Sequence, residues 1–517
     1  MTSYRRAGYA TSIQSTTGSI ATYARKLAQQ GRPDMEIILD DHIEGKIYTT
    51  FDALTGKVEI TAPHQARFDE IHITLEGTVK TFVDDKSPAN TKSKTTALHK
   101  FLKLVMPIAE TDYPQPRVAE AGRTYTFPFN FVIPDQLLPR SCSHACTADH
   151  VRDAHLQLPP SMGDREMSVQ DDFAPEMSKI QYAIKVRVVR NRETDSKDTV
   201  LVEGLRKLRI VPAVTEAPPM SIGPTDYDFA LSKTKSLKKG MFSGKLGKIT
   251  VSAAQTSALI FPAPSSESCT PPTTMATMIL RFDPHESSSQ PPRLGGLTTK
   301  IKVSTHFAAR PAAAFPTHRT SSALHETLRS VYSFSIPLSS RCVESVVWTK
   351  HTPSPAYTRR DSASSTESSD CSDNVYAPAP KENAAYYSAT ILVPITLPSS
   401  KTWLPTFHNC ITSRVYALDL NLTIHTPGTG VPVYSVGLRL PIQIAAAGNH
   451  SRRASLTVEE AAAELAGADE YLMARLIEMP HEDLIGNSVL AQADSSELPP
   501  SYEDFARPQQ IATLGRC

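Results

Sequence analysis

Alternation of apolar and polar residues with a period of two is the dominant pattern of this chain. Apolar or small residues occupy every second position in the segments 71–79, 125–133, 182–188, 416–424 and 434–444. This alternation predicts β-strands with one face buried and the other in water. Because many such strands occur and few helical patterns do, the pattern predicts an all-β protein built of antiparallel β-sandwiches.

The predicted strands fall into two blocks, which we expect to be two sandwich domains. The first block covers residues 34–213 and the second covers residues 244–447. The segment between them, 214–243, begins with a cluster of prolines and glycine. Such a cluster favours turns and irregular chain, so we interpret 214–243 as an interdomain hinge or linker.

Three further segments lack the strand pattern. Residues 352–385 are rich in serine and interrupt the second block, which predicts a disordered insert. Residues 1–33 are predicted to be a disordered N-terminal arm. Residues 448–517 are predicted to be a regulatory tail, partly helical, because Thr457 and Glu460 form a capping-box signature at a helix start.

Composition narrows the class of protein. The formal net charge of +1 argues against a surface built wholly for nucleic acid. The seven cysteines are scattered and odd in number, which favours a reducing compartment. No apolar run reaches the roughly 18 residues that a membrane-spanning helix needs, and the first residues lack the apolar core of a secretory signal. We therefore expect a cytoplasmic protein.

Motifs of known catalytic sites are missing from the sequence. It contains no serine-hydrolase elbow, no His-Glu-x-x-His and no dinucleotide-binding glycine fingerprint. Gly247-Lys248 resembles part of a phosphate-binding loop, but Phe242 stands where that loop needs glycine and Ile249 where it needs Ser or Thr. We expect no enzymatic activity and no cofactor; an enzyme without a recognisable motif is a minor alternative.

A group of cysteines and histidines lies in the first block, at Cys142, His144, Cys146, His150 and His155. A zinc site needs four closely placed ligands, usually with more compact paired spacings. We therefore interpret the group as a surface loop or short helix with ordinary thiols, and predict no metal site.

A dense run of lysines joins the linker to the second block, at positions 233, 235, 238, 239, 245 and 248. A solvated face or linker is the default interpretation. The alternative is contact with acidic lipid or acidic tails, where each lysine contributes about 1 kcal/mol. For that alternative the candidate contact residues are Lys235, Lys238, Lys239 and Lys245.

Two short motifs fit kinases that recognise basic residues. They place candidate phosphorylation sites at Ser455, after Arg452-Arg453, and at Ser362, after Arg359-Arg360. A phosphate at Ser455 would lie just before the predicted helix start at Thr457, where negative charge is favourable.

The most informative motif is Pro499-Pro500-Ser501-Tyr502, in the polar tail. Paired prolines favour the polyproline II conformation, which lowers the ordering cost of binding to an aromatic groove. The ring of Tyr502 then fills an adjacent pocket. We interpret Pro499, Pro500 and Tyr502 as a ligand for a WW domain; an ordinary proline-rich turn is the alternative.

Several segments resemble the arrestin superfamily, especially the fungal arrestin-related trafficking adaptors. The run Thr124 to Phe129 followed by Phe131 to Pro134 resembles a segment of the family's N-terminal domain, as does Ile71 to Gly77. Gly244 to Val251 resembles the first strand of an arrestin C-terminal domain. The resemblance covers about residues 35–447 and the tail motif.

The resemblance implies two arrestin-like β-sandwiches and no catalysis. Adaptors of this type bind plasma-membrane transporters or receptors and recruit a HECT-type ubiquitin ligase through Pro-Pro-x-Tyr, which leads to ubiquitination and endocytosis of the cargo. Pro499, Pro500 and Tyr502 carry the ligase-binding role over to this chain. It implies a cytoplasmic protein recruited to the plasma membrane and endosomes. The alternative is an endosomal sorting scaffold of the same fold that works without ubiquitin.

Overall fold

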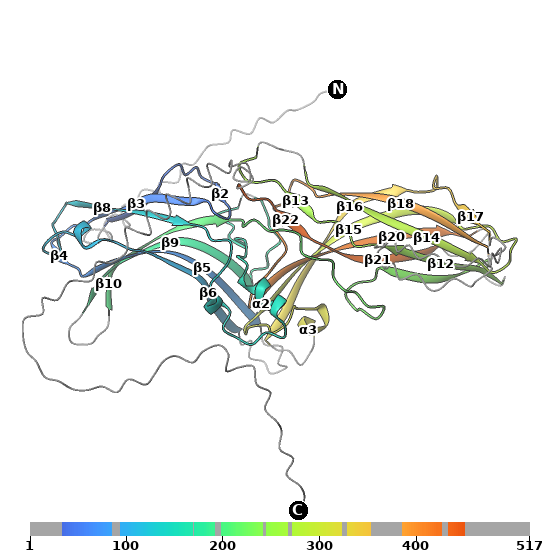
Figure 1. Ribbon diagram of the computed structural model, residues 1–517, viewed down its shortest axis with the longest axis horizontal. Coiled ribbons are helices and arrows are strands. Elements are labelled where there is room, and N and C mark those ends of the chain that lie inside the picture. The colour runs from blue at the N-terminus through green and yellow to red at the C-terminus, as the bar shows by residue number, and fades with distance from the viewer. Residues whose placement is uncertain are drawn as a thin grey trace, which may run out of the picture. The chain divides into compact units, whose positions relative to one another are not determined.

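A computed structural model describes the following ranges of the chain: 34–84, 94–168, 170–191, 198–240, 244–266, 271–322, 328–352, 385–426 and 433–449. These ranges consist mainly of β-strands in antiparallel sheets (Figure 1). Their α-helices, α2 (Asp149–Leu156) and α3 (His318–Ser322), are short. None of the helices in these ranges is both long and apolar enough to cross a membrane. The prediction of an all-β fold built of antiparallel sheets is confirmed.

The strands before residue 211 form two principal sheets. One has the order β1 (Asp34–Leu39), β3 (Ala53–Thr61), β8 (Thr124–Val132). The other has the order β2 (Ile47–Tyr48), β10 (Asp198–Ile210), β9 (Ser178–Asn191), β5 (Glu70–Asp84), β6 (Lys94–Met106). A short pair, β4 (Ala66–Arg67) with β7 (Val118–Ala119), closes one end. Phe127, Phe129 and Phe131 on β8 are buried, with exposed residues between them, so the alternation read from the sequence marks the core face.

The later strands also form two principal sheets. One has the order β11 (Ser232–Lys238), β12 (Lys245–Ala253), β14 (Thr273–Pro284), β18 (Tyr386–Thr396), β17 (Thr349–His351). The other has the order β16 (Arg329–Cys342), β15 (Arg293–Ala308), β20 (Thr412–His425), β19 (Phe407–His408), with β21 (Tyr434–Ile442) also paired to β20. A parallel pair, β13 (Leu259–Phe261) with β22 (Ile444–Ala446), completes this set.

Two details of the strand prediction differ from the structure. The segment 434–444 is divided, because β21 ends at Ile442 and β22 begins at Ile444. The predicted linker 214–243 contains β11, which pairs with β12 from Ser232 onward. The strand at Gly244 to Val251 is therefore not the first of its sheet. The sequence of β11 hides this because Leu237 is its one fully buried residue, and an edge strand needs few apolar anchors.

The two sets of strands have separate hydrophobic cores that exchange side chains. Phe173, from the chain before β9, packs in the core of the later strands, with its ring centroid 5.2 Å from that of Trp403. In the opposite direction, Leu404, Phe407 and Ile411 pack in the core of the earlier strands. We call this region of exchange the junction. Because each core is completed by side chains from the other set, the junction couples the two.

Phe173 reaches the other core from an unusual backbone conformation. Its φ is 58°, in the left-handed region that a bulky residue rarely adopts. The Asp171 carboxylate accepts a hydrogen bond from the Phe173 amide at 3.0 Å, and the Asp172 carboxylate accepts one from Ala174 at 3.0 Å. These bonds stabilise the turn that directs the ring across the junction.

Three predictions concern segments outside the described residues. They are the disordered arm at 1–33, the disordered insert, of which the structure describes only Thr352 and Ala385, and the tail helix beginning near Thr457. All three stay predictions.

Candidate functional site

The predicted tail and phosphorylation sites lie outside the residues that the structure describes. This applies to Pro499, Pro500 and Tyr502, and to Ser455 and Ser362. Their roles remain predictions, and the described residues supply the geometry of the other candidate sites.

The four candidate lysines lie on β11, at Lys239 just after its end, and at the start of β12, but in different environments. Lys238 and Lys245 are exposed and face each other in register. Lys235 donates to the Ser435 carbonyl at 3.0 Å and lies over the Tyr434 ring, 5.4 Å from its centroid. Lys238 and Lys245 are therefore the exposed members of the four candidates.

Lys239 is partly buried and pairs with Glu286 at 2.7 Å. β11 forms the edge of its sheet, where lysines also discourage pairing with another chain. Protection of this edge is therefore a structural explanation of the lysine run. The predicted contact with acidic lipid stays a prediction.

Arg414 is the central polar residue of the junction. Its side chain on β20 is fully buried, at 0% exposure. Its Nε donates to the Thr305 hydroxyl at 2.9 Å, and its Nη1 donates to the Asp172 carbonyl at 2.9 Å. Because Asp172 belongs to the earlier strands' part of the chain, this guanidinium bonds across the junction. A buried cation of this kind is stable only with such partners.

Two further buried hydrogen bonds cross the junction. The Thr81 hydroxyl donates to the Ala308 carbonyl at 2.6 Å. The Ser178 and Thr412 hydroxyls lie 2.9 Å apart and share a hydrogen bond. Hydrogen bonds shielded from water in this way fix the relative register of β5, β9, β15 and β20.

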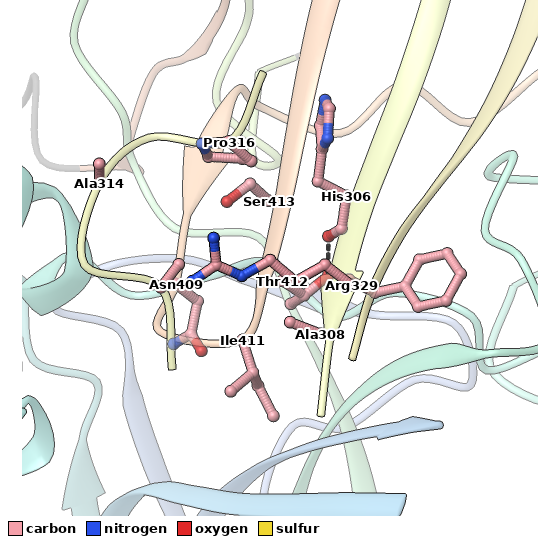
Figure 2. A pocket seen from close by; sticks show the side chains of 11 residues that line it. His306, Ala308, Ala314, Pro316, Arg329, Asn409, Ile411, Thr412 and Ser413 are labelled. Carbon is pink, nitrogen blue, oxygen red and sulfur yellow. Dashed lines mark hydrogen bonds between the residues drawn. The ribbon is translucent and has the colours of Figure 1, made fainter. Parts of the chain in front are cut away.

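A small cavity lies beside the junction, between the end of β15 and the turn from β19 to β20 (Figure 2). The Asn409 side chain is buried there, and its amide atoms have no protein partner among the described residues. Nearby, the Thr412 hydroxyl donates to the His306 carbonyl at 3.1 Å, drawn as a dashed line. The cavity measures about 20 Å³, which is room for about one water molecule and not for a metabolite.

His306, at the same cavity, is held neutral by its surroundings. Burial lowers its pKa to about 3, and the charges of His318, His408 and Lys302 act in the same direction. A neutral imidazole is therefore part of the folded state at ordinary pH.

The cysteine and histidine group forms a closed loop. The Leu137 amide donates to the Leu156 carbonyl at 2.7 Å, which brings the two ends of the loop together. A 3-10 turn at Pro139–Ser141 leads into Cys142, and α2 ends near His155. Cys142 and His155 are both buried. The interpretation of these two as surface loop residues is therefore wrong, although the short helix is present.

Most of the group is brought together. The Cys142 Sγ lies 3.4 Å from the His144 Nε2, 3.7 Å from the His155 Nδ1 and 3.8 Å from the Cys146 Sγ. His150 is not part of this cluster; its ring lies against Phe315, with centroids 5.6 Å apart.

Cys410 completes the cluster from the other set of strands, in the turn between β19 and β20. Ligand atoms of Cys142, His144, His155 and Cys410 all lie within 4.8 Å of one another. Sequence reasoning missed Cys410 because no local spacing connects it to the loop. Burial raises the pKa of the Cys410 thiol and lowers the pKa of His155 to about 4, so both are neutral near pH 7 without a cation.

Comparison with known proteins finds a similarity for the first part of the chain. Residues 35–208 match the family model described as Arrestin (or S-antigen), N-terminal domain. No curated protein matches the chain. The matched range begins in β1 and ends in β10, so it contains both principal sheets of the earlier strands. Residues 35–208 are therefore similar to an arrestin N-terminal domain, and the described chain has an arrestin-like all-β fold.

Proposed function

We propose that the protein is a non-enzymatic adaptor that binds a plasma-membrane transporter or receptor and recruits a HECT-type ubiquitin ligase. The observation that carries the proposal is an arrestin N-terminal domain together with Pro499-Pro500-Ser501-Tyr502 far outside it. The arrestin-like strands supply the scaffold that holds cargo. The tail motif supplies the ligase contact, through which the cargo is ubiquitinated and internalised.

The physical basis of the ligase contact is a preformed peptide conformation. Pro499 and Pro500 restrict the backbone to extended geometry, so little entropy is lost when their rings enter an aromatic groove. Tyr502 then places its ring in the neighbouring pocket and its hydroxyl at the rim. Glu497, Glu503 and Asp504 surround the motif with acidic side chains, which favours an exposed, soluble tail segment.

The membrane contact in this proposal involves the lysines of β11 and β12. Among the four candidate lysines, Lys238 and Lys245 are the exposed members and are the first to meet an acidic surface. Lys235 and Lys239 already have protein partners and contribute less. On this basis the cytoplasmic protein is recruited to the plasma membrane and to endosomes.

A titration of the tail peptide tests the proposal. A peptide spanning Ser495 to Arg507 is titrated against the isolated WW domains of the ligase, beside its Tyr502→Ala and Ser501→Ala variants. We expect Tyr502→Ala to abolish measurable binding, and the matched control Ser501→Ala to bind like the parent, because the motif places no constraint on that position. Equal binding of all three peptides would overturn ligase recruitment and leave the ubiquitin-independent sorting scaffold as the function.

A further inference from the structure

The cluster around Cys142 has the dimensions of a tetrahedral metal site. Zinc–sulfur bonds of about 2.3 Å and zinc–nitrogen bonds of about 2.0–2.1 Å place tetrahedral ligand atoms about 3.3–3.8 Å apart. The Cys142 Sγ lies 3.4 Å from His144 Nε2 and 3.7 Å from His155 Nδ1. With Cys410 included, the largest separation in the quartet is 4.8 Å, so one ion can be reached by small side-chain movements.

His144 is oriented so that it can act as a metal ligand. Its Nδ1 lies 3.1 Å from the Ala145 carbonyl oxygen. A carbonyl oxygen can only accept a hydrogen bond, so the nitrogen that bonds to it must carry a proton. The proton is therefore placed on Nδ1, and Nε2, which faces Cys142, presents its lone pair. Histidine ligands of metals commonly have their second nitrogen bonded to a carbonyl in this way.

The backbone holds the two sides of the cluster together. The Thr147 amide donates to the Ala313 carbonyl at 2.8 Å, and the Ala312 amide donates to the Cys410 carbonyl at 2.8 Å. The Cys410 Sγ also lies 3.8 Å from the Ser141 carbonyl. α2 and β19 contact each other in this region. Figure 1 shows α2 where the two sets of strands meet.

Ordinary buried thiols explain this arrangement of cysteines and histidines less well than a metal site does. Two histidine nitrogens directed at the same sulfur gain only weak hydrogen bonds from a thiol, whereas burial of the imidazoles has a cost. A divalent ion that deprotonates the thiols offsets this cost by binding all four groups. Two thiolates and two imidazoles are the donor set that favours zinc over magnesium or calcium.

We propose that Cys142, His144, His155 and Cys410 bind one structural Zn²⁺ ion. Three ligands come from the loop of the arrestin N-terminal domain and the fourth comes from the turn between β19 and β20. The ion therefore ties the two sets of strands together at the junction. Cys146, 3.8 Å from both Cys142 Sγ and His155 Nδ1, lies next to the ion and outside the quartet.

The first test is metal content. The full chain is purified after expression with added zinc, and bound metal is measured by mass spectrometry together with the spectrum of the Co²⁺-substituted protein. We expect about one zinc per chain, and a tetrahedral cobalt spectrum with a charge-transfer band of two thiolates. Removal of the ion with a chelator should lower the Tm and increase hydrogen exchange at the Thr147 and Ala312 amides. A wild-type protein that binds neither metal would overturn the proposal, as would a Cys142–Cys146 disulfide.

Variants test the ligand set. Cys410→Ser should weaken zinc binding by at least about 100-fold, because loss of a ligand exceeds the roughly 10–100-fold effect of losing an outer partner. The matched control is Cys342→Ser, an exposed free cysteine on β16, and His150→Ala is the control close to the loop; both should keep their zinc. Unchanged zinc affinity in Cys410→Ser would overturn the link across the junction.

A second pair of variants distinguishes the neighbouring donors and does not depend on the stability of Cys410→Ser. His144→Gln should lose the ion, and Cys146→Ser should retain it. The reverse result would overturn this choice of ligands. The cobalt spectrum of the wild-type protein gives an independent count of thiolates.

Discussion

The strand β11 and the junction both contain cations, but in opposite environments. Lys238 on β11 is exposed, whereas Arg414 at the junction is fully buried and bonds to Thr305 and Asp172. In the sequence the lysine run is conspicuous and the single arginine is not. A run of charged residues indicates a solvent-exposed segment, because charged side chains that are neighbours in sequence are rarely buried together. A single cationic residue among buried apolar residues indicates a side chain that is held by specific hydrogen-bond partners inside the protein.

The largest expected difference between the two regions concerns Phe173. Phe173→Ala should lower the free energy of unfolding by about 3–5 kcal/mol, because it removes a buried ring and leaves a cavity. The ring packs in the core of the later strands, although Phe173 precedes β9. Urea unfolding of the full chain measures this change. Leu98→Ala is the control at a residue 68% exposed, and should stay within about 0.5 kcal/mol. A loss below 1 kcal/mol for Phe173→Ala would show that the junction is not a shared core.

Removal of the buried cation should have the next largest effect. Arg414→Met keeps the length of the side chain but leaves the Asp172 carbonyl and the Thr305 hydroxyl without these donors, at a cost of about 2–4 kcal/mol. Lys238→Met, an exposed lysine with the same replacement, should cost less than about 0.5 kcal/mol. The same urea unfolding curves compare the two. Equal losses would remove the distinction drawn between the two cations.

The pH dependence of stability should sharpen the same contrast. Burial lowers the folded pKa of His306 to about 3, below its ordinary value of 6.5, so the unfolded chain takes up a proton first. His306 alone should therefore lower the stability as the pH decreases below about 6.5, by up to about 1.4 kcal/mol per pH unit, and its contribution should end near the folded pKa. In His306→Gln the slope between pH 6.5 and 5 should be shallower. An unchanged slope would mean that other groups cause it.

The smallest expected effect on stability belongs to the lysines. Lys238→Glu with Lys245→Glu should change the free energy of unfolding by less than about 1 kcal/mol, because both side chains are exposed. If the proposed membrane contact exists, the same pair should weaken binding to vesicles of acidic lipid, most at low salt. Lys235→Glu with Lys239→Glu is the matched pair, with smaller expected loss of vesicle binding because both lysines already have protein partners. If both pairs of variants bind the vesicles as well as the parent protein does, the lysines act only on the edge strand, where they discourage pairing with another chain.

The sequence predicts elements well where one pattern decides them. β5, β8, β9 and β20 were all indicated by period-two alternation, because each buries one face along most of its length. β11 was not, because an edge strand of Lys, Ser and Thr with Leu237 as its buried residue lacks the apolar repeat.

The candidate metal cluster could be predicted only in part. The residues from Cys142 to His155 are visible as a local group, but local spacing cannot show that Cys142 and His155 are buried. Cys410 lies in another set of strands, and only the tertiary fold brings it within reach. The same holds for Arg414 and Asp172, whose contact depends on how the two cores exchange side chains.

The exchange at the junction also sets an order of events during synthesis. The range that matches the arrestin N-terminal family model ends at residue 208, but Leu404, Phe407 and Ile411 complete the core of these earlier strands. A ribosome must therefore add roughly 200 more residues before those side chains emerge, which takes about 10–40 s at typical elongation rates of about 5–20 residues per second. During that interval the apolar surface that Leu404, Phe407 and Ile411 cover in the folded protein stays exposed on the nascent earlier strands.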